Sequence, residues 1–449
     1  MKKFIIFIVV LIWAGLCSFF IISSIYKKRN IDVVTANYYV EENQIKVDLK
    51  VNSTSDVLCI YNKVDYKANK KTCSFIIDDY VDYVIIKNKY NSIQYFFDDN
   101  KIKTKTTKLE GVIENNLIYV GEKAFIKYKY ETTGYPNKDV VIKSENDEIA
   151  TVEDGYVIGK AKGNTKIIIE LGEKKDELDL EVTDLISAPY WIGQDRKKLP
   201  CNAYTEEEAA LLDQLLEREV NKAGYGTRAG VVAAARFLTL QFKYRVPYFF
   251  ENGRVDFVDD DGKVKNTGTH KVEGEGRYYK KGLYLAPSKK KEIKYTFAGP
   301  ATWGCPLRNF EPKPERGYVK YAMMPNGLDC SGFISWAFVQ GGFDPGDIGA
   351  GESEGTQFTD KGKYTKLTRE LFDNGTIKTG DLMNFQGHIA IIVGIDGEDV
   401  YVAESLSFRS FDGVTVKKYN KSTINRTFPH VVLMDEYYKN DGNYTEHWE

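Results

Sequence analysis

The chain has 449 residues, which is long enough for about three domains of roughly 100 to 200 residues each. It carries 62 basic and 64 acidic residues, and a formal net charge of -2 leaves no basic field for binding nucleic acid or an anionic membrane surface. Nucleic acid is therefore not an expected partner. The 31 tyrosines and 24 phenylalanines, beside only 12 prolines, favour a chain rich in β-strands.

The first thirty residues form a segment of their own. Residues 4–25 carry no charged side chain, and a helix of that length, at a rise of about 1.5 Å per residue, would cross a hydrocarbon core of about 30 Å. This pattern predicts a transmembrane anchor within residues 1–30, with the membrane as a partner. A secretory segment cleaved near Ser23 and Ser24 is the alternative. Cys17 lies inside the apolar run and is expected to be one more apolar residue of the helix.

The cysteines indicate the compartment. Apart from Cys17 and one cysteine treated below, four remain: Cys59, Cys73, Cys201 and Cys305. Cys59 and Cys73 flank a polar turn between two strand-like runs, so we expect them to form a disulfide, and we expect a second between Cys201 and Cys305. Four buried free thiols are the alternative. With disulfides, everything after the anchor would lie in an oxidising space outside the cytoplasm.

Two β-rich segments are expected next. Residues 31–108 alternate apolar and polar side chains in runs such as YYVEENQIKVDLKV, which predicts a β-sandwich. Residues 109–186 contain SENDEIATVEDGYVIGKAKGNTKIIIEL, in which Gly155, Gly159 and Gly163 separate strand-length runs. This order resembles group-two bacterial immunoglobulin-like domains, which implies an extracellular spacer or adhesion module. A ligand-binding module is the alternative.

The last segment, residues 187–449, begins with helical patterns. Thr205 precedes EEEAALLDQLLEREV, where glutamates fill the first turn and leucines form one stripe, so a helix capped by Thr205 is predicted. A second helix is expected over about residues 228–242. The acidic turn DFVDDDGK does not have the spacing of a calcium loop, so a solvated turn and no metal site are expected there.

A cysteine opens a further apolar run, NGLDCSGFISWAF. Asp329 is a favoured N-cap residue, so the predicted helix begins at Cys330. In the first helical turn the sulfur faces unpaired backbone N–H groups, and the positive end of the helix dipole favours the thiolate, which is the reactive nucleophile. Ser331 and Gly332 are small and leave the approach to the sulfur open. A packed structural cysteine is the alternative.

One of the four histidines is a candidate base. His388 begins an expected strand in TGDLMNFQGHIAIIVGI and so lies at a strand end. Histidine exchanges a proton near neutral pH, and a Cys–His pair is the smallest group of side chains that performs acyl transfer. The other histidines are in settings that indicate no role: His270, His430 and His447.

The motifs DCSGF, TGDLMNF and GHIAIIVGI together resemble those of the NlpC-type cell-wall cysteine peptidases, over about residues 295–435. The resemblance implies a papain-like α+β core in which the nucleophile helix packs on an antiparallel sheet that bears the histidine. It implies Cys330 as the nucleophile, His388 as the general base and the backbone N–H of Cys330 as an oxyanion donor. It also implies peptidoglycan stem peptides as the substrate, often cut at the γ-D-glutamyl bond to the diamino acid.

The chain departs from this family's pattern before the cysteine. The family carries an aromatic residue and glycines closely before its cysteine motif, whereas here Trp303–Gly304 is separated from it by the insertion PLRNFEPKPERGYVKYAMM. The region over residues 187–295 is also unusually long. It has no assigned role beyond shaping a cleft or docking a partner.

The family's third polar residue falls in DVYVAESLS, where Glu404 is the candidate. A carboxylate there could accept the Nδ1–H of His388 and stabilise the imidazolium. The face of the strand decides whether it does so. With an even-numbered turn around residues 396–397, Ala403 and Ser405 would lie on the side of His388, and an odd-numbered turn would put Glu404 there. A solvated glutamate is the alternative.

The expected fold is therefore multidomain: an N-terminal transmembrane helix, two all-β sandwich domains and a C-terminal α+β papain-like domain with an antiparallel sheet. The expected function is a membrane-anchored extracellular hydrolase that cleaves an amide bond in peptidoglycan stem peptides, with Cys330, His388 and Glu404 as its catalytic residues. No cofactor and no metal are expected. A cell-wall amidase of the same chemistry and an inactive surface binding or adhesion protein are the alternatives.

Overall fold

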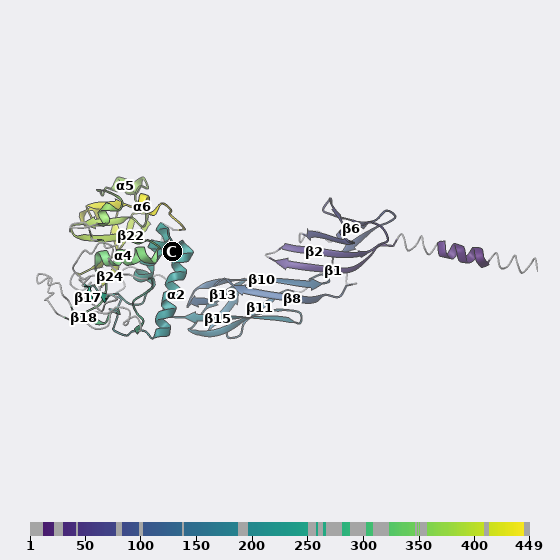
Figure 1. Cartoon of the computed structure of the whole chain (residues 1–449), viewed down its shortest axis with the longest axis horizontal. Helices are drawn as coiled ribbons and strands as arrows, with labels where there is room; N and C mark the ends of the chain where they lie inside the picture. The colour runs from purple at the N-terminus through teal and green to yellow at the C-terminus, as the bar shows by residue number, and fades with distance from the viewer. Residues whose placement is uncertain are drawn as a thin grey trace, which may run out of the picture. The chain divides into compact units, whose positions relative to one another are not determined.

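A computed structural model divides the chain into two compact units, Met1–Asp184 and Leu185–Glu449 (Figure 1). The described residues are 12–21, 30–41, 44–77, 83–97, 102–136, 139–186, 196–249, 257–258, 264–265, 281–287, 302–308, 323–345, 348, 350, 357–407 and 413–443. His270, His447 and most of the acidic turn DFVDDDGK lie outside them.

The prediction of an N-terminal transmembrane helix is wrong. In the described part of this segment, residues 12–21 are helical. Across the described ranges, no helix combines the length and the apolar character that crossing a membrane requires. An uncharged run shows that a segment is apolar, but it does not by itself show that the segment forms a membrane-spanning helix.

Unit 1 (Met1–Asp184) is built from short antiparallel strands and one parallel pair. Its strands are β1 (Asp32–Glu41), β2 (Gln44–Asn52), β3 (Leu58–Tyr61), β4 (Val64–Lys67), β5 (Thr72–Ile77), β6 (Tyr83–Lys87), β7 (Ser92–Phe96), β8 (Lys105–Ile113), β9 (Leu117–Tyr119), β10 (Lys123–Thr133), β11 (Val141–Ser144), β12 (Ala150–Glu153), β13 (Tyr156–Gly159), β14 (Gly163–Leu171) and β15 (Lys174–Thr183). The alternation read from the sequence is seen in β2, where Val47, Leu49 and Val51 are buried at every second position.

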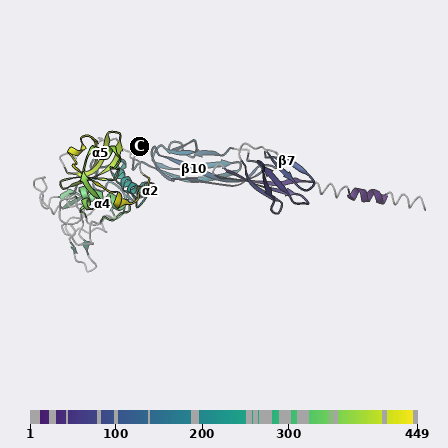
Figure 2. The ribbon, with the colours of Figure 1, turned by 90° about the horizontal axis from the view of Figure 1, so that it is seen from above.

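One seven-stranded sheet runs through both expected sandwiches. β1 pairs with β10, from Asn37 opposite Thr133 to Glu41 opposite Lys129, which gives the order β12-β13-β10-β1-β2-β5, with β8 also on β10. Two four-stranded sheets, β4-β3-β6-β7 and β11-β14-β15-β9, accompany it, and the buried residues form two separate cores. The long strand β10 is labelled in Figures 1 and 2. The expected domain boundary at residue 108 falls inside β8.

Both predicted disulfides are present. Cys59 of β3 and Cys73 of β5 join the two sheets that enclose the first core, with Cα atoms 6.2 Å apart. Cys201 and Cys305, 104 residues apart in the sequence, have Cα atoms 4.2 Å apart and close a long loop in unit 2. Cys330 is a free, buried cysteine. The alternative of four free thiols is therefore excluded.

Unit 2 (Leu185–Glu449) combines helices with a larger sheet. Its elements are α2 (Glu206–Ala223), α3 (Arg228–Arg236), the π-helical turn η1 (Phe237–Gln241), β16 (Phe257–Val258), β17 (Val264–Lys265), β18 (Pro306–Arg308), β19 (Met323–Pro325), α4 (Cys330–Gln340), the turn η4 (Phe358–Asp360), β20 (Lys363–Lys366), α5 (Arg369–Asp373), β21 (Leu382–Phe385), β22 (His388–Asp396), β23 (Asp399–Leu406), β24 (Gly413–Asn420), the turn η5 (Ile424–Arg426), β25 (His430–Leu433) and α6 (Asp435–Tyr438). The predicted cap of α2 is confirmed, because Thr205 Oγ1 accepts from Glu208 N and Glu208 Oε2 accepts from Thr205 N.

A six-stranded antiparallel sheet, in the order β20-β25-β21-β22-β23-β24, organises unit 2. α4 contacts β22 and β23, and Figure 1 shows it beside β22. α3 also contacts β22, so both helices lie against the inner strands of the sheet. A core of side chains that includes Phe372, Met383, Ala390, Ile392 and Phe428 packs together in this unit. This arrangement places the start of α4 next to the strands that follow residue 387.

Removing the long-range disulfide is expected to destabilise unit 2. The double variant Cys201→Ser/Cys305→Ser should lose about 2–4 kcal/mol of unfolding free energy, because a bridge across a long loop restricts the unfolded chain. Tryptophan fluorescence in urea can follow this, since Trp303 lies two residues before Cys305 with its ring 5.9 Å from that of Trp336. Reductant should lower the stability of unit 2 in the parent chain and leave unit 2 of the double variant unchanged, because the remaining bridge, Cys59–Cys73, lies in unit 1. Equal responses of the two proteins to reductant would contradict this account.

Candidate active site

Cys330 is the first residue of α4, as the sequence predicts. Asp329 Oδ1 accepts a hydrogen bond from Gly332 N at 2.6 Å, which satisfies one of the free N–H groups of the first turn. Cys330 is therefore fixed in the turn where the backbone N–H groups have no helical partner. Its side chain retains little exposure, at 9%.

Hydrogen bonds to other parts of unit 2 hold the segment before Cys330. Leu328 N donates to Pro247 O at 3.0 Å, and Ser405 Oγ of β23 donates to Leu328 O at 2.7 Å. Gly327 passes so close to the backbone of Pro247 that an added Cβ would lie 1.8 Å from Pro247 O. Only glycine fits there, which accounts for the Gly in the motif NGLDCSGF.

His388 begins β22 beside the sulfur. The turn before it contains Gly387, whose φ of +65° is one that glycine adopts without strain. Asn384 Nδ2 donates to His388 O at 2.9 Å and holds the strand start. The Sγ of Cys330 lies 4.0 Å from Gly387 O, so the nucleophile candidate and the base candidate are adjacent.

Glu404 of β23 completes the group. Its Oε2 lies 2.7 Å from Nε2 of His388, and both side chains are buried, with exposures of 2% and 7%. The contact uses Nε2 and not the expected Nδ1, which leaves Nδ1 as the ring nitrogen for Cys330. Lys417 of β24 places its Nζ 3.0 Å from the other oxygen, Oε1, as a charge contact and not a well-aligned hydrogen bond. The structure thus brings all three predicted residues together.

The charges of the group support one another. Burial lowers the pKa of His388, but hydrogen bonds to Cys330 and Glu404 outweigh burial and raise that pKa from 6.5 to about 9. For Glu404, burial raises the pKa, whereas the hydrogen bond to His388 and the charge of Lys417 together bring it below its usual range. At neutral pH the site therefore holds an imidazolium and a carboxylate. A positively charged ring thus lies beside the sulfur of Cys330.

A bulge in β22 determines that Glu404 faces His388. The turn between β22 and β23 has two residues, since Asp396 lies opposite Asp399. With an unbroken ladder this even-numbered turn would put odd-numbered positions of β23 on the histidine side. The pairing shifts by one residue between Ile392 and Gly394, and beyond that point Ile391 lies opposite Ala403. Even-numbered Glu404 consequently lies on the same face as His388.

The insertion before the cysteine does not displace Trp303–Gly304 from α4. β18 and β19, at the two ends of the inserted segment, pair with each other, and Gly304 N donates to Asn326 O at 2.9 Å. The ring of Trp303 packs edge-on against that of Trp336 in α4. The aromatic–glycine pair is therefore next to the nucleophile helix although it is distant in sequence.

Two contributors were not singled out from the sequence. Lys417 gave no signal, since a lysine on an edge strand is ordinarily solvated. Arg236, a single charge in the apolar run AGVVAAARFLTLQF, did give one, because a charged residue in a buried helix needs a partner, and its Nε donates to Val393 O of the bulge at 2.7 Å. Within the described part of the chain, no three His, Cys, Asp or Glu side chains are grouped as metal ligands.

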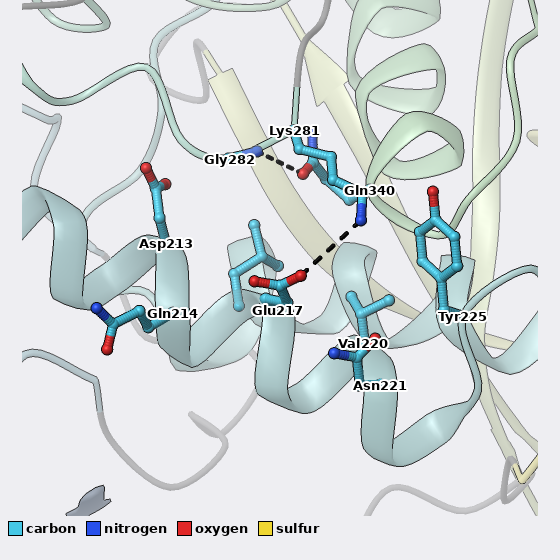
Figure 3. Close-up of a pocket in the computed structure, with 10 residues that line it drawn as sticks. Asp213, Gln214, Glu217, Val220, Asn221, Tyr225, Lys281, Gly282 and Gln340 are labelled. Atoms are coloured by element: carbon cyan, nitrogen blue, oxygen red, sulfur yellow. Dashed lines mark hydrogen bonds and ion pairs between the residues drawn. The ribbon is translucent and has the colours of Figure 1, made fainter.

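A cavity of about 230 Å³ lies elsewhere in unit 2, between α2, Lys281–Gly282 and the last residue of α4 (Figure 3). Gly282 N donates to Gln340 Oε1 at 2.7 Å. The ammonium of Lys281 lies 4.1 Å from the ring centre of Tyr225 and 3.9 Å from a Glu217 oxygen. Cys330 is at the opposite end of α4, about 15 Å away at 1.5 Å per residue. The cavity is therefore separate from the candidate active site.

Comparisons with known proteins do not assign a family. No family model and no curated protein matches the chain. Among solved structures, the chain is similar to the native conformation of E. coli alpha-2-macroglobulin seen by cryo-EM, with 10% identity and a TM-score of 0.13. The match covers 37% of this chain and 13% of that one, and similarity this low assigns neither fold nor function.

Proposed function

We propose that the chain is a cysteine hydrolase that cleaves an amide bond in peptidoglycan stem peptides. The observation that carries the proposal is the convergence of three side chains: the sulfur of Cys330 beside the start of β22, and the 2.7 Å contact between His388 and Glu404. The motif resemblance to NlpC-type peptidases supplies the substrate class.

In the first half of the reaction, the thiolate of Cys330 attacks the amide carbonyl carbon. The backbone N–H of Cys330, in the first turn of α4, is available to donate to the developing oxyanion. The imidazolium of His388 gives its Nδ1 proton to the leaving amine as the C–N bond breaks. Glu404 holds Nε2 throughout, so the ring keeps its orientation.

In the second half, water releases the thioester. Neutral His388 takes a proton from water at Nδ1, the hydroxide attacks the acyl carbon, and the C–S bond breaks to give a carboxylic acid and the thiolate. The imidazolium formed is again stabilised by Glu404. His388 thus acts as general acid in the first half and as general base in the second, and Glu404 orients it in both.

The disulfides support a location outside the cytoplasm. One bridge is in each unit, and disulfides persist in oxidising compartments. Unit 1 contains none of Cys330, His388 and Glu404, which supports a role as a spacer for unit 2.

The test compares the purified chain with its Cys330→Ala variant on purified peptidoglycan, with the released fragments identified by mass spectrometry. Cys17→Ala is a matched control, because Cys17 is the other free cysteine in the described residues and is exposed. We expect fragments from the parent chain and from Cys17→Ala, and none from Cys330→Ala.

The new amino terminus identifies the bond. A free diamino acid terminus indicates the endopeptidase reaction, and a free peptide terminus at the sugar link indicates the amidase reaction. Identical fragment profiles from the parent chain and Cys330→Ala would contradict the proposal and favour a surface binding or adhesion protein.

A further inference from the structure

The position of Glu404 depends on one extra residue in β22. Val393 is the residue at which the pairing with β23 shifts, and it is fully buried. A bulged residue leaves the regular ladder, so its backbone groups need partners from elsewhere. If Val393 instead entered a regular ladder opposite Val402, Ala403 and Ser405 would take the side of His388 and the carboxylate would point away from it.

The partner of the bulge comes from α3. Arg236, the last residue of that helix, donates from Nε to Val393 O at 2.7 Å. α3 also packs against β22, which brings the guanidinium to the bulge. The contact joins the last residue of α3 to the backbone carbonyl of the bulged residue in β22.

We propose that Arg236 is a positioning residue of the candidate active site, whose bond to the Val393 carbonyl keeps the bulge in place and so keeps Glu404 on the side of His388. The inference rests on the proposed pairing of Cys330, His388 and Glu404. It does not depend on turnover, because it concerns how the site is held.

The test is the titration of His388 in the full chain, followed by NMR with labelled histidine. The chain has four histidines, and a His388→Ala sample assigns the signal. The titratable side chains that contact His388 among the described residues are Cys330 and Glu404, and Lys417 contacts the far oxygen of Glu404. We expect the pKa of His388 to be about 9 in the parent chain and to fall toward the usual value of 6.5 in Arg236→Leu.

The direction of the change separates two causes. Removal of a nearby positive charge would by itself raise the pKa of an imidazole, because one repulsive charge is lost. Loss of the Glu404 contact lowers it. A pKa of His388 that stays at the parent value or rises in Arg236→Leu overturns the proposal.

Two variants control for charge and for the hairpin. Arg236→Gln places an amide nitrogen at the chain position of Nε, so it keeps a donor without the charge and should keep the pKa of His388 near that of the parent chain. Arg369→Leu removes an arginine that pairs with Glu398 in the turn of the same hairpin, 2.7 Å away, and should leave that pKa unchanged. A fall in the pKa of His388 in both controls would overturn the proposal.

A relocated residue tests the register without touching α3. Deleting Val393 and inserting one glycine after Gly397 moves the extra residue from the bulge to the turn and keeps His388 and Glu404 sixteen residues apart. This variant should retain the high pKa of His388, and adding Arg236→Leu to it should no longer lower that pKa. If adding Arg236→Leu to this variant still lowers the pKa of His388, Arg236 does not act through the bulge and the proposal is overturned. Because the readout is a titration, absence of peptidoglycan cleavage would leave this result standing.

Discussion

Replacing Glu404 by glutamine is expected to lower kcat on peptidoglycan by about 10²–10⁴-fold. The side chain keeps its size, but the amide cannot provide the negative charge that stabilises the imidazolium of His388 across the 2.7 Å contact. The pH–rate profile should change with the rate. Its alkaline limb, which reports loss of the imidazolium, should move from about pH 9 toward lower pH.

The sign of the pH effect follows from the raised pKa of His388. A histidine whose pKa is higher in the folded chain than its usual 6.5 stabilises the fold fully below pH 6.5, and this contribution is lost as pH rises through about 9. The parent chain should therefore lose stability between these two values. Glu404→Gln should show a smaller loss over the same range, since less stabilisation of the imidazolium is present.

Glu398→Gln is the matched control for this substitution. Glu398 lies in the turn of the same β22–β23 hairpin, is half exposed and pairs with Arg369. Glu398→Gln should leave both kcat and the alkaline limb of the pH–rate profile unchanged. If Glu404→Gln behaves like Glu398→Gln, Glu404 does not act on His388 and the solvated-glutamate interpretation is correct.

Features set by short-range chemistry were predictable from the sequence. Asp329 caps α4 and Thr205 caps α2 because a side-chain oxygen close to a helix start satisfies free N–H groups wherever the helix packs. The motifs around Cys330 and His388 likewise indicated a helix start and a strand start, and the structure places both there.

Features set by long-range packing were not predictable. The turn length alone would have put Ala403 on the side of His388, and only the bulge at Val393, paired with an arginine more than 150 residues earlier, reverses this. The pairing of β1 with β10 is also non-local, so the alternation of each strand could not show that one sheet passes through both cores. The predicted transmembrane helix rested on hydrophobicity alone, and no helix in the described ranges combines the length and apolar character that a membrane span requires.

An arginine at each end of α3 attaches this helix to the sheet. Arg236 bonds the bulge of β22, and Arg228 at the first position bonds residues that precede β21 and that follow β25. α3 therefore connects the buried Arg228–Asp381 ion pair with the contact that we propose orients Glu404. The two arginines should nevertheless differ in effect: loss of Arg236 should change the site, and loss of Arg228 should change the stability of unit 2.

Replacing Arg228 by methionine is expected to lower the unfolding free energy of unit 2 by about 3–5 kcal/mol, because it leaves a buried charge without its partner. The guanidinium is fully buried, 2.8 Å from Asp381, which is itself 1% exposed. It also contacts Asp435 and Asp441 and lies 4.8 Å from the ring centre of Tyr438. Urea unfolding followed by tryptophan fluorescence measures the loss.

The controls for Arg228→Met use a surface pair and a second substitution. Arg369→Met breaks the exposed pair with Glu398 and should cost no more than about 1 kcal/mol. Adding Asp381→Asn to Arg228→Met removes the stranded carboxylate, while the amide oxygen can still accept from Met434 N, so part of the lost stability should return. Equal losses in Arg228→Met and Arg369→Met, or a further loss in the double variant, would mean that the buried charge of Asp381 is not what makes Arg228 necessary.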